Sequence, residues 1–154
     1  MPTTILDKSF TKNLYIVTEG YIDAQILRTL LICDSYINVY SVLSKGFNNI
    51  PSVSRTIELD MDLYDKMIII FDADSNDRET IDNKISTIKF LTNWESYKKR
   101  IGIFCMIPNI ENYLDIRWKP NKDINDIRQF ISNNLKKLRE KEIIREIQNF
   151  INAE

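Results

Sequence analysis

The first two thirds of the chain alternate short apolar runs with longer segments in which apolar residues recur at helical spacing. Four runs rich in β-branched residues predict strands at 14–18, 38–43, 67–71 and 101–107. Helical spacing predicts helices at 22–34, 50–60 and 77–92. The third and fourth runs, MIIIF and IGIFCMI, have no polar alternation, which indicates strands buried on both faces. This pattern predicts an α/β fold with a four-stranded, mainly parallel sheet and helices on both faces.

The last third of the chain has a helical pattern throughout. Residues 109–118 predict a short helix, and 123–152 predict one or two helices with an apolar stripe. That stripe either covers the sheet or docks a protein partner or a second copy of the chain. We expect a single domain over 1–154, with a core at about 14–118 and a C-terminal helical extension at about 119–154.

Charge is distributed unevenly along a chain of ordinary composition. The 154 residues are 44% hydrophobic and 28% charged, with net charge -1, so there is no global basic surface for coating nucleic acid. Residues 1–94 contain nine basic and thirteen acidic residues, whereas 95–154 contain twelve and nine. The acidic part would suit a metal ion and the basic part a phosphate, although chance also produces such an imbalance.

The rarer residue types limit the possible chemistry and location. The chain has no histidine, which excludes histidine-based triads, Cys-His dyads and His-ligated zinc sites. Cys33 and Cys105 lie in apolar runs and are interpreted as small core residues of a cytosolic protein. The N-terminus lacks the order of a signal peptide, and no apolar run approaches the ~20 residues of a membrane span. We therefore expect a cytoplasmic protein without membrane contact.

Acidic residues follow three of the four predicted strands. Glu19 follows the first strand, Asp72 and Asp74 the third, and Glu111 the fourth, while Asp23 comes one helical turn after Glu19. Because the carboxyl ends of parallel strands meet at one edge of a sheet, these five acids are expected to converge. Two unit charges ~4 Å apart repel by about 4 kcal/mol at an effective dielectric of ~20, so a counter-charge is needed. Mg²⁺ or Mn²⁺, which prefer carboxylate oxygens, would supply it.

Each acid on its own also has an ordinary interpretation. Loops are rich in aspartate, and Glu111 alone would be a solvated helix residue. Asp77, which follows the DxD segment, is better explained as the cap of the next helix than as a ligand. The joint order of E-G, D-x-D and P-x-x-E at successive strand ends is what favours a metal site.

Four segments together resemble the Toprim domain, which is shared by topoisomerases, DnaG-type primases, RecR proteins and OLD-family nucleases. They are LYIVTEGYIDAQIL, SVLSKGFNNI, MIIIFDADSND and IPNIENYLD. The resemblance covers about residues 14–118 and is strongest to small stand-alone bacterial Toprim proteins and to the Toprim domains of OLD-like nucleases. The sequence has no counterpart of the OLD ATPase domain or of the tyrosine-bearing domain of topoisomerases, so strand passage is not expected.

The resemblance implies a Rossmann-like Toprim fold and a nuclease that uses Mg²⁺ or Mn²⁺. Glu19, Asp72 and Asp74 match its catalytic residues, and the same three with Asp23 and Glu111 match its metal ligands. Without histidine, Glu19 or a metal-bound hydroxide is expected to act as the base. The rival interpretations are a non-catalytic or partner-dependent Toprim subunit, such as a phage-defence effector, and a phosphate-binding regulatory domain with a vestigial site.

Several basic residues are candidate contacts to a nucleic-acid backbone, and Trp118 is a candidate for stacking on an unpaired base. The basic candidates are Lys45, Lys98, Lys99, Arg100, Arg117 and Lys119. Each is also compatible with a solvated surface. The sequence leaves open whether the nucleic-acid partner is DNA or RNA, and whether cleavage is internal or from an end.

Overall fold

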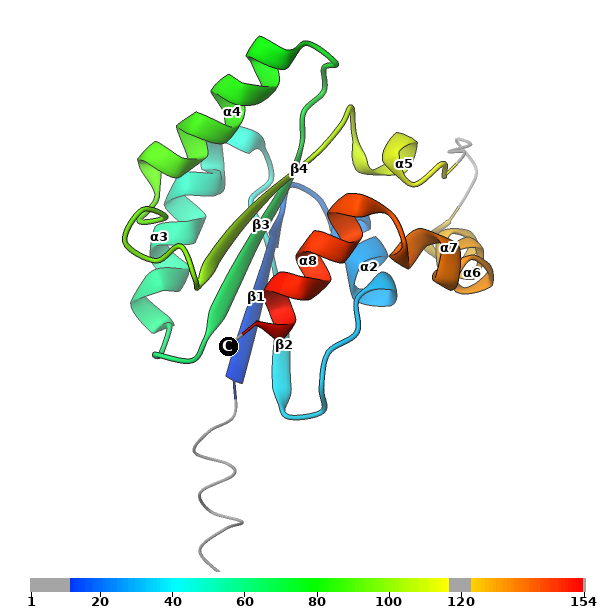
Figure 1. Cartoon of the computed structure of the whole chain (residues 1–154), viewed down its shortest axis with the longest axis horizontal. Coiled ribbons are helices and arrows are strands. Elements are labelled where there is room, and N and C mark those ends of the chain that lie inside the picture. The colour runs from blue at the N-terminus through cyan, green and yellow to red at the C-terminus, as the bar shows by residue number, and fades with distance from the viewer. Residues whose placement is uncertain (1–11, 117–122, 154) are drawn as a thin grey trace, which may run out of the picture.

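The computed structural model describes residues 12–116 and 123–153, which form a parallel sheet between two layers of helices (Figure 1). The four strands are β1 (Lys12–Thr18), β2 (Ile37–Leu43), β3 (Lys66–Asp72) and β4 (Ile101–Met106). They are ordered β2-β1-β3-β4, and every neighbouring pair is parallel. The predicted α/β class and four-stranded sheet are confirmed, and the sheet is parallel throughout.

The strand order creates a switch point beside the two central strands. The chain leaves β1 for β2 on one side, then crosses back to place β3 on the other side of β1. In such doubly wound sheets the crevice outside the carboxyl ends of the strands, where the order reverses, is where ligands bind. The ends of β1 and β3 therefore border the position that this topology favours for a functional site.

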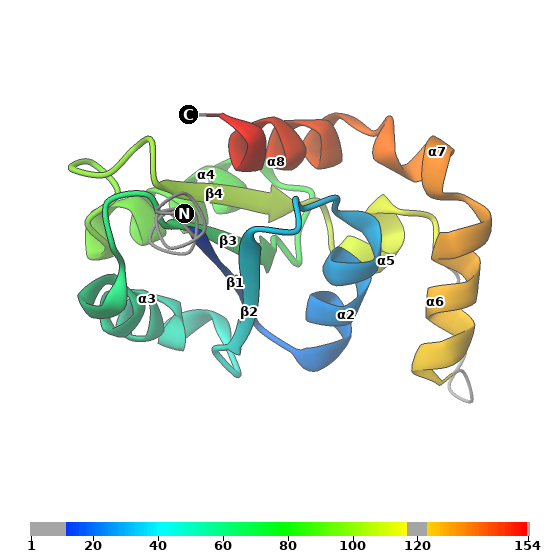
Figure 2. The same ribbon diagram turned by 90° about the horizontal axis from the view of Figure 1, so that it is seen from below.

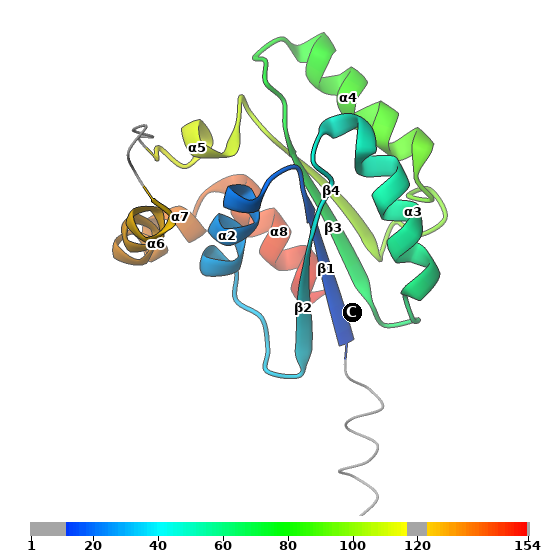
Figure 3. The ribbon, with the colours of Figure 1, turned by 180° about the vertical axis from the view of Figure 1, so that it is seen from behind.

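Alternating side chains of each strand bury themselves under opposite helix layers. On one face β1 and β3 pack against α2 (Tyr21–Leu30) and α8 (Glu142–Asn152) through a cluster that contains Leu14, Ile16, Ile68 and Ile70. On the other face they pack against α3 (Ile50–Asp60) and α4 (Arg78–Leu91) through Val17, Met67, Ile69 and Phe71. Figure 3 shows α3 and α4 together on one side and α2 and α8 on the other. β3 is buried on both faces, as its continuous apolar run predicts.

Residues 123–152 form three helices instead of the predicted one or two. They are α6 (Ile124–Asn133), α7 (Leu135–Arg139) and α8. The last break has a tertiary cause: Lys141 is extended and pairs with Asp115 at 3.4 Å, and the Ile143 N–H donates to the Tyr113 hydroxyl at 2.9 Å. These partners lie on other segments, so helical periodicity gives no sign of them.

The apolar stripe of α8 covers the sheet. Ile144, Ile147 and Ile151 are buried in the same cluster as β1 and β3, and α8 lies along β4 (Figure 2). α6 packs against α2 farther out. For the part of the stripe on α8, cover for the sheet is the interpretation that the structure bears out.

Some predicted boundaries differ from those observed. The helix expected at 22–34 ends at Leu30, because Leu31 adopts an extended conformation, and this leaves Cys33 half-buried outside the helix. The helix expected at 109–118 is α5 (Ile110–Tyr113), and the loop after β2 contains a short 3-10 helix η1 (Phe47–Asn49). Cys105 is buried as predicted, and both cysteines are free thiols. In the ranges that the structure describes, no helix has the length and apolar character needed to cross a bilayer.

Candidate metal centre

Three carboxylates meet at the carboxyl edge of the sheet. Asp23 in the first turn of α2, Asp72 at the end of β3 and Glu111 in the first turn of α5 each offer an oxygen, and these oxygens lie within 4.8 Å of one another. All three residues are half-buried. Residues 49 and 39 positions apart in the sequence thus form one cluster, as the strand-end pattern predicts.

Backbone amides hold this cluster in place. The Asp72 Oδ1 atom accepts a hydrogen bond from the Ile110 N–H at 2.9 Å, which ties the end of β3 to the start of α5. Asn109 caps α5 by accepting from the Asn112 N–H at 2.9 Å, and this sets the turn that contains Glu111. These two hydrogen bonds therefore hold the backbone of the turn that contains Glu111 next to Asp72.

Glu19 lies against the cluster from the neighbouring strand. The Asp72 N–H donates to the Glu19 Oε2 atom at 3.5 Å, a long contact across the switch point between β1 and β3. The Glu19 carbonyl accepts from the Lys45 N–H at 3.0 Å, so the loop after β2 also borders this edge. Lys45 itself has an exposed side chain and a φ of 58°, in the left-handed region. Glu19 lies beside Asp72, as the strand-end pattern predicts.

Asp74 is farther out on the rim. Its side chain is exposed, and it is not among the three residues with oxygens within 4.8 Å. Its backbone is held by a hydrogen bond from the Asp74 N–H to the Pro108 carbonyl at 2.7 Å, with φ of 53°. Asp77 accepts from the Thr80 N–H at 3.1 Å and caps α4, as predicted. Of the five candidate ligands, three converge, Glu19 adjoins them and Asp74 stands at the edge.

Burial and crowding make the charged cluster costly. The pKa of Asp23 is raised to about 7, first by burial and then by the charges of Asp72, Glu111, Glu19 and Asp74. Burial likewise raises the pKa of Asp72 to about 7, although the hydrogen bond from Ile110 opposes the shift. Burial also raises the pKa of Glu19. Without a cation, the centre therefore keeps protons near neutral pH.

The donor set fits a hard divalent cation. Asp23, Asp72 and Glu111 offer only carboxylate oxygens, the ligands that Mg²⁺ and Mn²⁺ prefer, whereas zinc sites commonly use cysteine and histidine. Cys105 does not join the set as a thiolate, because burial raises the pKa of its thiol to about 11. The residues present match the expected Mg²⁺ or Mn²⁺.

Lys84 of α4 is a residue of this site that we did not predict. Its ammonium donates to the Asp72 carbonyl at 3.4 Å and lies 5.0 Å from the centre of the Phe47 ring. The available signal was its spacing, since Lys84 falls three residues after Ile81 and four before Ile88, both buried. A cation within the apolar stripe of a helix that follows a DxD segment is a sequence signal for a residue of the site.

The basic residues before β4 lie away from the acids. Lys98, Lys99 and Arg100 precede the amino end of β4, and a six-residue strand puts them roughly 20 Å from the opposite edge. Lys98 pairs with Glu95 at 3.0 Å, and the Arg100 guanidinium donates to the Asp62 carbonyl at 2.8 Å. A ligand of the acidic cluster would reach these three residues only if it extended along the whole sheet. Arg117, Trp118 and Lys119 lie outside the described residues.

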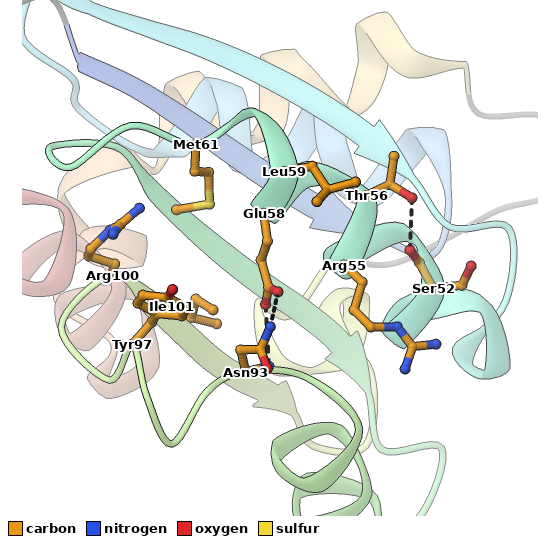
Figure 4. A pocket seen from close by; sticks show the side chains of 10 residues that line it. All are labelled: Ser52, Arg55, Thr56, Glu58, Leu59, Met61, Asn93, Tyr97, Arg100 and Ile101. Carbon is orange, nitrogen blue, oxygen red and sulfur yellow. Dashed lines mark hydrogen bonds between the residues drawn. The ribbon is translucent and has the colours of Figure 1, made fainter.

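Two cavities differ in their relation to the acids. An open groove of about 900 Å³ begins at Glu111 and is lined by Asn109, Asn112, Phe130 and Lys137, among others. A cavity of about 590 Å³ lies between α3 and the segment that leads into β4, where Glu58 binds Asn93 (Figure 4). No acid of the cluster lines the second cavity, whereas Glu111 lines the groove.

Comparisons of the chain with models of known protein families, with curated proteins and with solved structures found no match. The resemblance to Toprim domains therefore stays a prediction from the quoted sequence segments.

Proposed function

We propose that this protein is a metal-dependent phosphodiesterase of the Toprim type that hydrolyses DNA or RNA with Mg²⁺ or Mn²⁺. The observation that supports the proposal most directly is the convergence of Asp23, Asp72 and Glu111 within 4.8 Å at the switch point of a parallel sheet. The order of acids in the sequence, E-G, D-x-D and P-x-x-E, agrees with it.

The roles of the residues follow from their positions. Asp23, Asp72 and Glu111 would hold the ion, with Asp74 available from the rim. A bound Mg²⁺ or Mn²⁺ polarises a phosphoryl oxygen and lowers the pKa of a water molecule. Glu19 adjoins the cluster and burial raises its pKa, so its carboxylate is a stronger base than a free one and would serve as the proton acceptor in a chain without histidine.

An extended polymer suits the surroundings of the site. The groove beside Glu111 is open and lined by Asn109, Asn112 and Asn134, whose amide groups can donate to and accept from a polar ligand. The backbone of Lys45 adjoins Glu19 on the opposite side, where its exposed side chain could meet a phosphate. We place this activity in the cytoplasm, where two free thiols are ordinary.

The test is a cleavage assay of the purified chain with single-stranded, double-stranded and structured DNA and RNA. Each substrate is incubated with Mg²⁺, Mn²⁺ or Ca²⁺ beside Asp72→Asn, Glu111→Gln and the control Asp34→Asn, which changes an exposed acid away from the site. We expect cleavage with Mg²⁺ or Mn²⁺ by the wild type and the control, and a loss of at least 100-fold in both cluster variants. Metal binding without cleavage of any substrate would favour the non-catalytic or partner-dependent interpretation, and activity that survives both cluster variants would contradict the proposal.

A further inference from the structure

The ammonium of Lys84 is held in a defined position beside the metal centre. Side chains of a helix lean toward its N-terminus, which for α4 is the end near the acids, and the long stem of Lys84 follows that direction. The ammonium contacts the Asp72 carbonyl at 3.4 Å and the Phe47 ring at 5.0 Å from its centre. Phe47 in turn packs edge-on against the buried Phe71, with ring centres 5.3 Å apart. The Phe47 ring that contacts the ammonium is thus held in place by a residue of the hydrophobic core.

In the part of the chain that the structure describes, the Lys84 ammonium forms no ion pair with a carboxylate. Its hydrogen-bond acceptor is a neutral carbonyl, and none of the ion pairs found among the described residues includes it. It still acts on the acids at longer range, because its charge lowers the pKa of Glu19 against the effect of burial. An ammonium has three donors, so at least one is available to a ligand. Lys84 therefore combines a fixed place with unused binding capacity.

An anionic substrate needs such a group here. The acids around the centre outnumber the charges that one or two divalent ions bring, so the edge of the sheet stays negative when all are ionised. A phosphodiester carries a negative charge of its own and would be repelled by the uncompensated carboxylates. Among the cations of the described residues, Lys84 has its ammonium against the backbone of a cluster residue, whereas Lys98 and Arg100 are at the other end of the sheet.

We propose that Lys84 binds a non-bridging oxygen of the substrate phosphate on the Glu19 side of the metal centre. This inference rests on the function proposed above and assigns the substrate contact within it. Lys84 is then a substrate-binding residue and not a support for the metal ligands. The two roles differ in one measurable respect: removing the charge should weaken the substrate and leave the affinity for the metal ion intact or higher.

Three variants of α4 separate these roles. Lys84→Met keeps most of the stem and removes the charge, and Lys84→Arg keeps the charge. Lys89→Met is the control and removes a charge from the same helix. The Lys89 ammonium lies 4.2 Å from the centre of the Trp94 ring. Each is measured for Mn²⁺ affinity by calorimetry, for binding of a fluorescent oligonucleotide in Ca²⁺ by anisotropy, and for cleavage in Mn²⁺.

We expect Lys84→Met to bind Mn²⁺ at least as tightly as the wild type, while its affinity for the oligonucleotide falls about 10- to 100-fold, the effect of one charge-assisted hydrogen bond. Cleavage falls at least as much, Lys84→Arg recovers most of both, and Lys89→Met behaves as the wild type. Wild-type binding and cleavage by Lys84→Met would overturn this inference alone. Loss of Mn²⁺ affinity or of folding in that variant would assign Lys84 a structural role and overturn it as well. A wild type that neither binds nor cleaves the oligonucleotide would refute both the inference and the proposed function.

Discussion

Replacing Asp72 with asparagine should stabilise the metal-free protein at alkaline pH. Asparagine has nearly the shape of aspartate, and its side-chain oxygen can still accept the hydrogen bond from the Ile110 N–H. The substitution removes one negative charge from a group of acids that burial and mutual repulsion already disfavour. The substitution thus tests the energetic cost of the charge while the packing around residue 72 stays nearly the same.

The expected gain follows from the pKa of Asp72. A rise from 3.8 to about 7 is roughly three units, and at about 1.36 kcal/mol per unit the ionised form costs up to about 4 kcal/mol in the folded protein. Because Asp72 is only half-buried, solvent screens part of this cost, and we take half of it, about 2 kcal/mol. For a domain of this size, that free energy corresponds to an increase of about 6 °C in melting temperature.

The sign of the pH dependence is set by which state holds the proton. Between about pH 4 and pH 7 the folded protein keeps a proton on Asp72 that the unfolded chain has released, so this contribution to stability is full below pH 4 and is lost as the pH rises through 7. Asp72→Asn has no carboxyl group to ionise at this position, so this loss of stability does not occur in the variant. Its advantage should therefore be small at pH 5 and complete at pH 8.

Thermal unfolding followed by circular dichroism at pH 5, 6, 7 and 8, with a chelator present, measures this difference. Asp34→Asn changes an exposed acid and is the matched control, with no gain expected at any pH. Added Mn²⁺ should reverse the order, because the wild type gains stability from the bound ion and Asp72→Asn does not. An asparagine variant that melts at or below the wild type at pH 8, or gains equally at pH 5 and pH 8, would refute the claim that the fold crowds ionised carboxylates.

Three further changes test other parts of the structure. Because Asp23 and Asp72 must lose their protons to bind a cation, Mn²⁺ affinity measured by calorimetry should be at least about 10-fold lower at pH 6 than at pH 8, and an affinity independent of pH would contradict this. Asp77→Ala should lower the melting temperature by removing the cap of α4 and leave Mn²⁺ affinity unchanged, whereas a loss of affinity would make Asp77 a ligand. Gly102→Ala places a Cβ 2.8 Å from the Phe104 ring and 3.1 Å from the Phe150 ring, so chemical denaturation should show a loss of about 1–3 kcal/mol, and no loss would mean that α8 packs loosely over β4.

The parts of the fold that depend on local patterns could be predicted from the sequence. Doubly buried strands such as 67–71 leave continuous apolar runs, and an acid directly after such a run must lie at the carboxyl edge. The cap at Asp77 and the proline in the first turn of α3 are also local signals. These features need no knowledge of distant contacts, which is why the sheet and the convergence of Asp23, Asp72 and Glu111 were predictable.

Features that depend on contacts between distant residues could not be predicted. The break before α8 depends on Tyr113 and Asp115, some 30 residues earlier in the chain. The place of Lys84 depends on Phe47, which is 37 residues away. The run Lys98-Lys99-Arg100 directly precedes the strand predicted at 101–107, so its place at the amino end of β4 was predictable, whereas the contact of Arg100 with the Asp62 carbonyl was not. Such details depend on packing, which a single sequence does not display.

The hydrogen bonds around the acids distinguish this cluster from an ordinary acidic surface. Acids on a surface extend into water and separate, since each loses hydration and gains repulsion by approaching another. Here the Asp72 carboxylate is tied to the Ile110 N–H and the Glu19 carboxylate lies against the Asp72 N–H, so backbone atoms draw both toward the other acids. The fold thus holds the carboxylates close at a cost that their raised pKa values record. A bound divalent cation would remove that cost, and this is the physical reason for seeking the function of the protein at this edge of the sheet.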